Sequence, residues 1–324
     1  MRRSGTHPDG CVLLRDLGSR LAANLGMGLE RQGITFPSAV WIVWGAKRPG
    51  QGALAREATE RRRMLTTGIR FALGVGIGVL GTLIGAGGGW MIVPLLLLGF
   101  HFTPQQAVGT SLAVVFLNAL SGSIAYMLQR RVLYSMGLAF AVATIPGALL
   151  GAWMVQYLNS RWFSVLFGGF LLCIAVFLHR GERLFFSPRP LEHVNARDLK
   201  SFRSPTLRLG IAISFVVGIL SSLFGVGGGI IHVPFLIVVL GLPVHSATAT
   251  SHFVLAITSL TGSLIFLRQG QVRLAAAASM GLGVLIGAQG GAFLSTRMPG
   301  EPIRHLLAVA LGIFAIRLVL RVVW

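Results

Sequence analysis

The sequence predicts an all-α polytopic membrane protein built from two homologous repeats. First, 54% of the 324 residues are hydrophobic and only 11% are charged, with a mean hydropathy of +0.76; soluble domains carry about 25% charged residues. Second, apolar runs of about 20 residues, enough to cross a hydrocarbon core of about 30 Å, recur from residue 68 onward. Third, the segments GAGGGWMIVP (85–94) and GVGGGIIHVP (225–234) lie 140 positions apart. A membrane β-barrel would alternate apolar and polar residues, and these runs do not.

The charged residues avoid the apolar runs. None of the nine Asp and Glu residues lies between Met64 and Arg180 or between Leu199 and Gly300. The net charge of +19 sits in the N-terminal region and in the loops, as is typical of loops beside membrane helices. These basic residues form no compact basic domain, so the expected environment is a lipid bilayer and no nucleic-acid partner is expected.

The chain divides by composition into four parts. Residues 1–63 are rich in Gly and Arg, and their one apolar patch, AVWIVWG, is too short to span a membrane. We expect a disordered basic tail, or a segment that is not translated, with Met64 as an alternative start. Two membrane repeats, 64–179 and 207–324, flank a polar cytosolic linker at 180–206.

Each repeat is expected to hold four membrane helices and one broken, re-entrant segment rich in glycine. In the first repeat the expected helices and broken segment are 68–86, 89–101 (broken), 105–128, 135–157 and 161–179. In the second they are 207–226, 229–241 (broken), 245–267, 272–295 and 302–323.

Special residues of the two repeats share one register, which isolated recurrences of small residues in membrane helices would not produce. Internal repeats of this kind are typical of transporters. Basic loops on one side favour four crossings in each repeat and parallel repeats; the alternative is five crossings in each and inverted repeats. The matched residues include Gly87, Gly88, Gly89, Pro94, Thr110 and Ser111 with Gly227, Gly228, Gly229, Pro234, Thr250 and Ser251.

The glycines and prolines predict unwound backbone at membrane depth. Each glycine disfavours a helix by about 1 kcal/mol relative to alanine, and Pro94 and Pro234 lack an amide donor. Such backbone is tolerated only where protein buries it or where it lines a cavity. The amide groups at the start of a half-helix can then bind an anion. The alternative interpretation is that the glycines only permit close helix crossing.

The repeated motifs resemble those of a known family. GAGGGWMIVP followed by QQAVGTSLAVV, and GVGGGIIHVP followed by HSATATSHFVL, look like the paired signatures of the sulfite exporter TauE/SafE family. The resemblance covers residues 68–323. It implies a transporter of small sulfur-containing anions such as sulfite and sulfonates, and it identifies the family better than the substrate.

The candidate substrate-binding residues lie in the two breaks and in the helices that follow them. Hydroxyl groups there can donate to an oxyanion, and two histidines can change charge near neutral pH. His232 stands where the first repeat has Ile92, and His252 stands where it has Leu112. The bland alternative is a neutral histidine packed in a helix interface. The full set is Gly87, Gly88, Gly89, Pro94, Thr110, Ser111, Gly227, Gly228, Gly229, His232, Pro234, Thr250, Ser251 and His252.

The resulting hypothesis is a secondary transporter with alternating access around a site between the repeats, coupled to protons. Other small organic anions are the alternative substrates, and a non-transporting accessory or scaffold protein is the alternative class. No enzyme is expected, because GxSxG and HExxH do not occur, and two cysteines are too few for a metal site. No cofactor is expected, and a homo-oligomer is compatible with the sequence. The expected location is the inner or plasma membrane, with both termini cytoplasmic.

Overall fold

The computed structural model describes residues 51–180 and 205–295, with 297, 309, 311–318 and 320. The chain divides into two units, Met1–Leu65 and Thr66–Trp324, and the second unit carries all the helices that build the candidate site. The expected N-terminal tail lies outside the described residues up to position 50, and residues 51–63 are helical. The expected linker lies outside them between 181 and 204.

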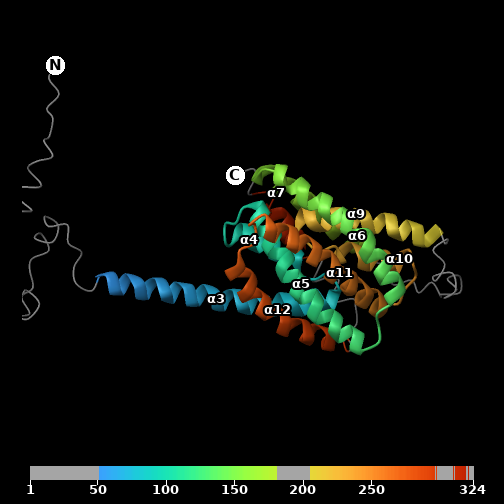
Figure 1. Ribbon diagram of the computed structural model, residues 1–324, viewed down its shortest axis with the longest axis horizontal. Coiled ribbons are helices and arrows are strands. Elements are labelled where there is room, and N and C mark those ends of the chain that lie inside the picture. Colours follow the sequence, from blue (N-terminus) through green and yellow to red (C-terminus); the bar gives the residue numbers. More distant parts are fainter. Residues whose placement is uncertain are drawn as a thin grey trace, which may run out of the picture. The chain divides into compact units, whose positions relative to one another are not determined.

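The described part of the chain consists of helices joined by short connections, without strands, which confirms the predicted all-α class (Figure 1). Helices α4, α5 and α6 have the same lengths as α10, α11 and α12 and begin 140 positions before them. The last expected helix is described at 311–318, where it is helical. The elements are α3 (Gln51–Ile84), α4 (Gly89–Leu98), α5 (Pro104–Leu128), α6 (Tyr134–Met154), η1 (Val155–Tyr157), α7 (Ser160–Arg180), α9 (Pro205–Phe224), α10 (Gly229–Val238), α11 (Val244–Arg268) and α12 (Leu274–Leu294).

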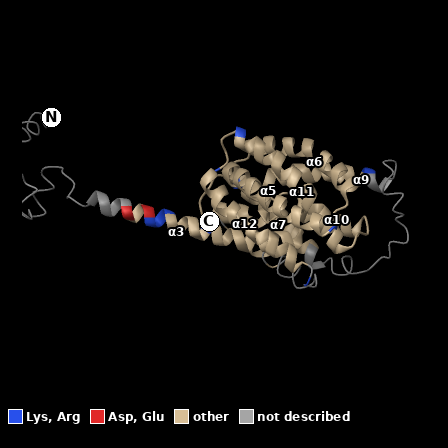
Figure 2. Cartoon of the chain, turned by 60° about the horizontal axis from the view of Figure 1, so that its bottom comes forward, with Lys and Arg blue, Asp and Glu red and all other residues tan. Residues whose placement is uncertain are grey.

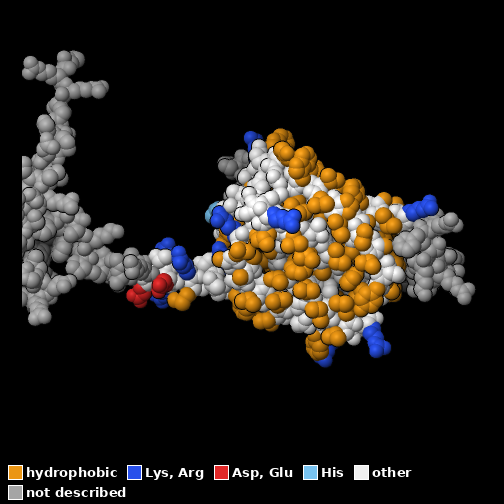
Figure 3. Space-filling model, viewed as in Figure 1, with side chains coloured by type: hydrophobic (Ala, Val, Ile, Leu, Met, Phe, Trp, Pro, Cys, Tyr) orange, Lys and Arg blue, Asp and Glu red, His pale blue; other side chains and the backbone are white. Residues whose placement is uncertain are grey.

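The surface of the helical body is apolar. Large hydrophobic side chains such as Leu138, Trp153 and Ile286 are more than half exposed, and one face of the body is covered by such groups (Figure 3). Basic side chains gather toward helix ends (Figure 2), and six of the described helices are long and apolar enough to cross a membrane. Water would not tolerate so large an apolar surface, so these helices lie in a bilayer and the protein is a multi-pass membrane protein.

Helices α3 and α4 form a re-entrant hairpin. The guanidinium carbon of Arg70, in α3, lies 4.6 Å from the ring centroid of Phe100, just after α4. The chain therefore leaves α4 near the level of Arg70, so the second half of α3 and α4 run in opposite directions. Helix α4 has 10 residues, or about 15 Å, half the thickness of a hydrocarbon core. The predicted broken segment thus returns to its own side instead of crossing.

The two repeats are inverted. Gly109 and Gly122 of α5 pack against Phe266 and His252 of α11, so the two helices run antiparallel. The expected parallel repeats are wrong, because the α3–α4 hairpin makes no net crossing and leaves α5, α6 and α7 to cross in the first repeat. This inversion divides the basic loops between the two faces, so the charge pattern that favoured parallel repeats loses its basis.

One helix of each repeat packs closely against the first helix of the other repeat. Gly147 and Gly151 of α6 lie so close to α9 that a Cβ on either would overlap a backbone carbonyl oxygen there. Gly287 and Gly291 of α12 meet α3 in the same way. These glycines, which lie outside the two breaks, permit close helix crossing in two parallel pairs, α6 with α9 and α12 with α3.

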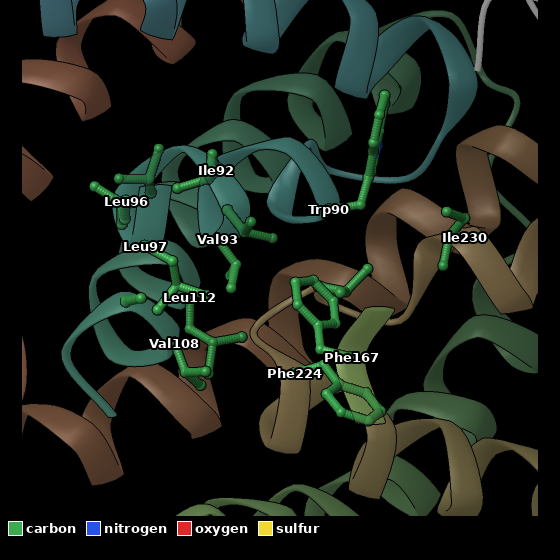
Figure 4. Packing of buried hydrophobic residues seen from close by; sticks show 14 of the residues in the cluster. Trp90, Ile92, Val93, Leu96, Leu97, Val108, Leu112, Phe167, Phe224 and Ile230 are labelled. Atoms are coloured by element: carbon green, nitrogen blue, oxygen red, sulfur yellow. The ribbon is translucent and has the colours of Figure 1, made fainter. Parts of the chain in front are cut away.

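The core lies around the re-entrant helices. Ile92, Val93 and Leu96 of α4 are fully buried, beside Val108 and Leu112 of α5 (Figure 4). Helix α7 closes the other side of this core with an aromatic contact. The rings of Phe167 and Phe224 stack with centroids 5.3 Å apart, and Phe170 stacks on Phe224 at 4.9 Å.

We expect Gly287→Ala to lower the thermal stability of the purified protein in detergent. Its Cβ would overlap the Val75 carbonyl oxygen and force α12 away from α3, at a cost of about 1–3 kcal/mol. Gly290→Ala, on the same helix α12, is the matched control. Its Cβ would meet only Val79 Cγ2 of α3, at an ordinary contact distance of 3.7 Å. Equal melting temperatures for the two variants would show that α3 and α12 are not in backbone contact.

Candidate functional site

The two glycine breaks lie against each other at the centre of the body. A Cβ on Gly89 would overlap the carbonyl of Gly225, and a Cβ on Gly229 would overlap that of Gly85. These contacts are reciprocal, as expected for repeats related by a two-fold axis. The two re-entrant helices therefore begin side by side, and glycine is needed at both starts because there is no room for a side chain.

Left-handed backbone at the glycines ends one helix and starts the next. Gly87 and Gly88 have φ of 72° and 80°, and Gly227 and Gly228 have φ of 85° and 83°. Gly88 and Gly228 are the N-cap residues of α4 and α10, and no side chain caps either helix. The first amide groups of both helices thus lack a side-chain acceptor, the arrangement that favours an anion at a helix N-terminus.

The expected contribution of the prolines to the unwound segment is wrong. Pro94 lies inside α4 and Pro234 lies inside α10, several residues after each break. A proline removes only its own amide donor, and the flanking residues Val93 and Val233 remain helical and buried. The unwound backbone is confined to 85–88 and 225–228.

Two apolar side chains fill the centre between the breaks. A Cβ on Gly227 would meet Leu255 Cδ1 at 2.5 Å and Val115 Cγ1 at 2.7 Å, and Gly87 faces the same two side chains. Val115 and Leu255 occupy equivalent positions of α5 and α11, and both are buried. A ligand bound between the loops in this conformation would have to displace them.

The Thr110–Ser111 and Thr250–Ser251 pairs make hydrogen bonds between the two repeats. Ser111 Oγ donates to the Gly225 carbonyl at 2.7 Å, and Ser251 Oγ donates to the Gly85 carbonyl at 3.3 Å. These two hydroxyl hydrogens are thus occupied by the opposite break. Thr110 Oγ1 accepts from the backbone N–H of Arg273 at 3.0 Å. Its counterpart Thr250 accepts from that of Leu133 at 3.1 Å, and both threonines keep a hydroxyl hydrogen that these bonds do not use.

His232 has a partner within its own repeat. Its Nε2 lies 3.0 Å from Ser214 Oγ, and its ring stacks on Phe140 with centroids 6.4 Å apart. The side chain is buried. This environment resembles the bland interpretation of a neutral histidine satisfied in a helix interface.

His252 has a different environment. It is fully buried, and neither ring nitrogen is hydrogen-bonded within the described part of the chain. The Gly85 carbonyl lies close to the ring. Its ring meets the edge of Tyr126, with centroids 5.7 Å apart and planes at 87°. Within the described residues, the hydrogen bond and ring contacts of His232 and of His252 involve different residues.

Three polar residues beside His252 were missed as site residues by sequence reasoning. Thr82 Oγ1 donates to Asn118 Oδ1 at 3.2 Å, and Asn118 Nδ2 donates to the Gly87 carbonyl at 3.1 Å. Tyr126 Oη donates to the Thr82 carbonyl at 2.9 Å. The only signal in the sequence is that Asn118 is a polar residue within an apolar run. The described residues contain no cluster of His, Cys, Asp and Glu that could hold a metal ion.

Inverted repeats, re-entrant helices that meet at their N-termini and a buried polar cluster define a class of protein: the polytopic membrane transporters. The family follows from the sequence match. The model of the family described as "Sulfite exporter TauE/SafE" matches residues 70–318, and the chain belongs to this family.

Curated relatives agree with this class. The chain is 34% identical over 267 residues to "Probable membrane transporter protein YunE" of Bacillus subtilis (strain 168), which covers 78% of this chain and 96% of the relative. It is 26% identical over 259 residues to "Probable membrane transporter protein MJ0441" of Methanocaldococcus jannaschii, covering 75% and 92%. It is 24% identical over 258 residues to "Probable membrane transporter protein YfcA" of Escherichia coli (strain K12), covering 78% and 90%. No solved structure matches the chain significantly.

Ser111→Ala is expected to destabilise the fold by about 1–3 kcal/mol, because the buried Gly225 carbonyl would lose its donor. Thermal unfolding in detergent measures the effect. Ser251→Ala removes the longer, equivalent bond and should lower the melting temperature less. A larger effect for Ser251→Ala would contradict the bonding found here.

Proposed function

We propose that the protein is a secondary transporter of small sulfur-containing anions such as sulfite and sulfonates. One observation carries the proposal: two glycine-capped helix N-termini meet inside a helical body whose membrane spans contain no carboxylate. Among the described residues the only acidic ones are Glu57 and Glu60, ahead of the apolar part of α3. A cation carrier usually offers carboxylates to its ion, whereas amides, hydroxyls and imidazoles suit an oxyanion.

The proposed binding region comprises both breaks and the polar residues after them. Helix dipoles favour negative charge at the starts of α4 and α10, and the hydroxyls of Thr110 and Thr250 have hydrogens to offer. His232 and His252 are the groups proposed to neutralise the anion or to carry a proton with it. The proposed set is Gly87, Gly88, Gly89, Pro94, Thr110, Ser111, Gly227, Gly228, Gly229, His232, Pro234, Thr250, Ser251 and His252.

The proposed mechanism is alternating access, with moving units that differ from the sequence repeats. Separating the repeats along their sequence boundary would break the glycine contacts of α6 with α9 and of α12 with α3. We therefore propose that α3, α4 and α12 form one unit, while α6, α9 and α10 form the other. The breaks move with these units, because Gly88 packs on Ile77 of α3 and Gly228 packs on Val217 of α9.

The proposed setting is the cell membrane, with both termini on the cytoplasmic side, lipid around the apolar surface and coupling to protons. A homo-oligomer is compatible with this arrangement. Labelling of single cysteines placed in the 129–133 and 269–273 loops of intact cells tests the orientation. The inverted repeats require that a membrane-impermeant thiol reagent reach only one of these two loops.

Purified protein in proteoliposomes should carry radiolabelled sulfite faster than protein-free liposomes, and a pH gradient should change the rate. Sulfate, a sulfonate and acetate serve as parallel substrates. Flux of acetate alone would transfer the proposal to carboxylates. Correctly folded protein that carries none of these anions would refute anion transport and favour the accessory or scaffold role.

Gly228→Val should abolish this flux while membrane insertion persists. Valine at φ 83° costs roughly 1–3 kcal/mol of backbone strain, and its Cβ would lie 2.7 Å from Val217 Cγ1. Gly241→Val is the matched control, since Gly241 has φ 64° but faces open space. Wild-type flux from folded Gly228→Val protein would separate the break from the transport path.

A further inference from the structure

The polar cluster around His252 has no equivalent on the other side of the two-fold axis. Thr82, Asn118, Tyr126 and His252 are each at most 1% exposed. Their counterparts in the opposite repeat are Ser222, Thr258, Phe266 and Leu112. The axis thus relates a cluster with an imidazole, an amide and a phenol to a place that has only hydroxyls and apolar groups.

The packing shows that the two places correspond. Gly122 lies against the His252 ring, where a Cβ would meet Cδ2 at 2.7 Å and Nε2 at 2.9 Å, and it also approaches Thr82. Gly262 lies in the same way against Leu112 and Ser222. Because Gly122 has no side chain, there is space beside it for the His252 ring. At the equivalent position beside Gly262, the same backbone arrangement holds Leu112.

The bonds in the cluster do not involve the imidazole. Asn118 donates one of its two side-chain N–H groups to the Gly87 carbonyl, and Tyr126 Oη donates to the Thr82 carbonyl. Thr82 donates to Asn118. Among the described residues, neither ring nitrogen of His252 has a hydrogen bond although its side chain is fully buried. Burying a polar group without a partner costs about 1–3 kcal/mol, so a ligand that pairs with it is favoured.

The charged groups around the cluster favour an anion over a cation as that ligand. Apart from Glu57 and Glu60, which precede the apolar part of α3, the described residues contain no carboxylate. Arg131 follows α5, where its backbone N–H donates to the Tyr126 carbonyl at 3.2 Å, and its Nη1 is buried without a partner. An imidazole in either tautomer offers one N–H donor, and a protonated imidazole offers two. These groups can donate to a small oxyanion, whereas the described residues around them offer a cation no negative charge.

We propose that each chain has a single oxyanion site at this cluster, with His252 as the direct ligand and with Thr82, Asn118 and Tyr126 holding the ring and the Gly87 carbonyl in place. His232 is not assigned as a direct ligand, because its Nε2 already has Ser214 Oγ as a partner. The proposal rests on the proposed transport of small anions and narrows it to one of the two motif histidines. The inverted repeats therefore provide one binding site per chain instead of two equivalent ones.

Titration calorimetry with sulfite in detergent, together with sulfite flux, tests the site. His252→Leu copies the residue at the equivalent position and should weaken sulfite binding at least about tenfold and stop flux, since a hydrogen bond to a charged group is lost. Cys173→Ala, at an exposed position of α7 outside the binding region, should leave the Kd within about threefold of wild type. His252→Gln, which retains an N–H donor, should recover part of the affinity.

A steric pair guards against misfolding as the cause. Gly122→Ala and Gly262→Ala both add a Cβ that would lie within 3 Å of a neighbouring side chain, and both should lower the melting temperature. Only Gly122→Ala displaces the His252 ring, so only it should weaken sulfite binding. Equal Kd values for these two variants, or wild-type affinity in folded His252→Leu, would overturn the site.

The wild-type protein separates this proposal from the transport proposal. Wild-type flux of sulfite together with unchanged flux in His252→Leu would refute the His252 site and leave anion transport standing. If wild type binds acetate but neither sulfite nor sulfate, the sulfur-anion function fails and the His252→Leu comparison on acetate decides the site. A wild-type protein that binds none of these anions would overturn both.

Discussion

Backbone amide and carbonyl groups inside a bilayer must find partners within the protein, and the rest of this structure follows from how two breaks in the helices meet that requirement. The glycines at 85–88 and 225–228 take left-handed backbone that no regular helix can satisfy. Each break is buried against the other, and each receives a serine hydroxyl from the opposite repeat. Neither break could lie at this depth alone. The inverted pairing of the repeats is thus the condition under which both re-entrant helices exist.

The helices and the breaks could be predicted closely from sequence, because both depend on local properties. Apolar run length marks a membrane helix, and consecutive glycines mark its end, so the expected helix 105–128 differs from α5 by a single residue. The orientation of the repeats could not be predicted in this way. It depends on whether the expected helix 68–86 crosses the bilayer or forms a hairpin with the re-entrant segment, which the Arg70–Phe100 contact reveals and no local pattern encodes. Proline was weighted too heavily, since Pro94 costs α4 one amide donor without ending the helix.

The candidate site was predictable only in part for a related reason. His232 and His252 looked alike in sequence, each replacing an apolar residue beside a repeated motif. Their difference lies in what surrounds each ring: Ser214 bonds His232, whereas the ring of His252 has no hydrogen bond within the described part of the chain. Thr82 and Tyr126 join the second environment across 44 positions. The hydroxyls of Ser111 and Ser251 were expected to face a substrate, but in this conformation they hold the opposite break. A residue's type shows what it can bond, and only the fold shows what it does bond.

The exchange of helices between repeats gives the proposed site a connection to motion. Thr82 belongs to α3, within the proposed unit of α3, α4 and α12, whereas Asn118 and His252 belong to the central antiparallel pair of α5 and α11. An anion bound at His252 would therefore contact a fixed element beside a moving one. A ligand shifts a conformational equilibrium only by its difference in affinity for the two states. A site at such a boundary has that difference built in, because a movement of α3 alters the surroundings of His252 while leaving α11 in place. With two equivalent sites, each unit would have its own ligand. With one asymmetric site, the affinity for a single anion depends on the position of one unit, that of α3, α4 and α12.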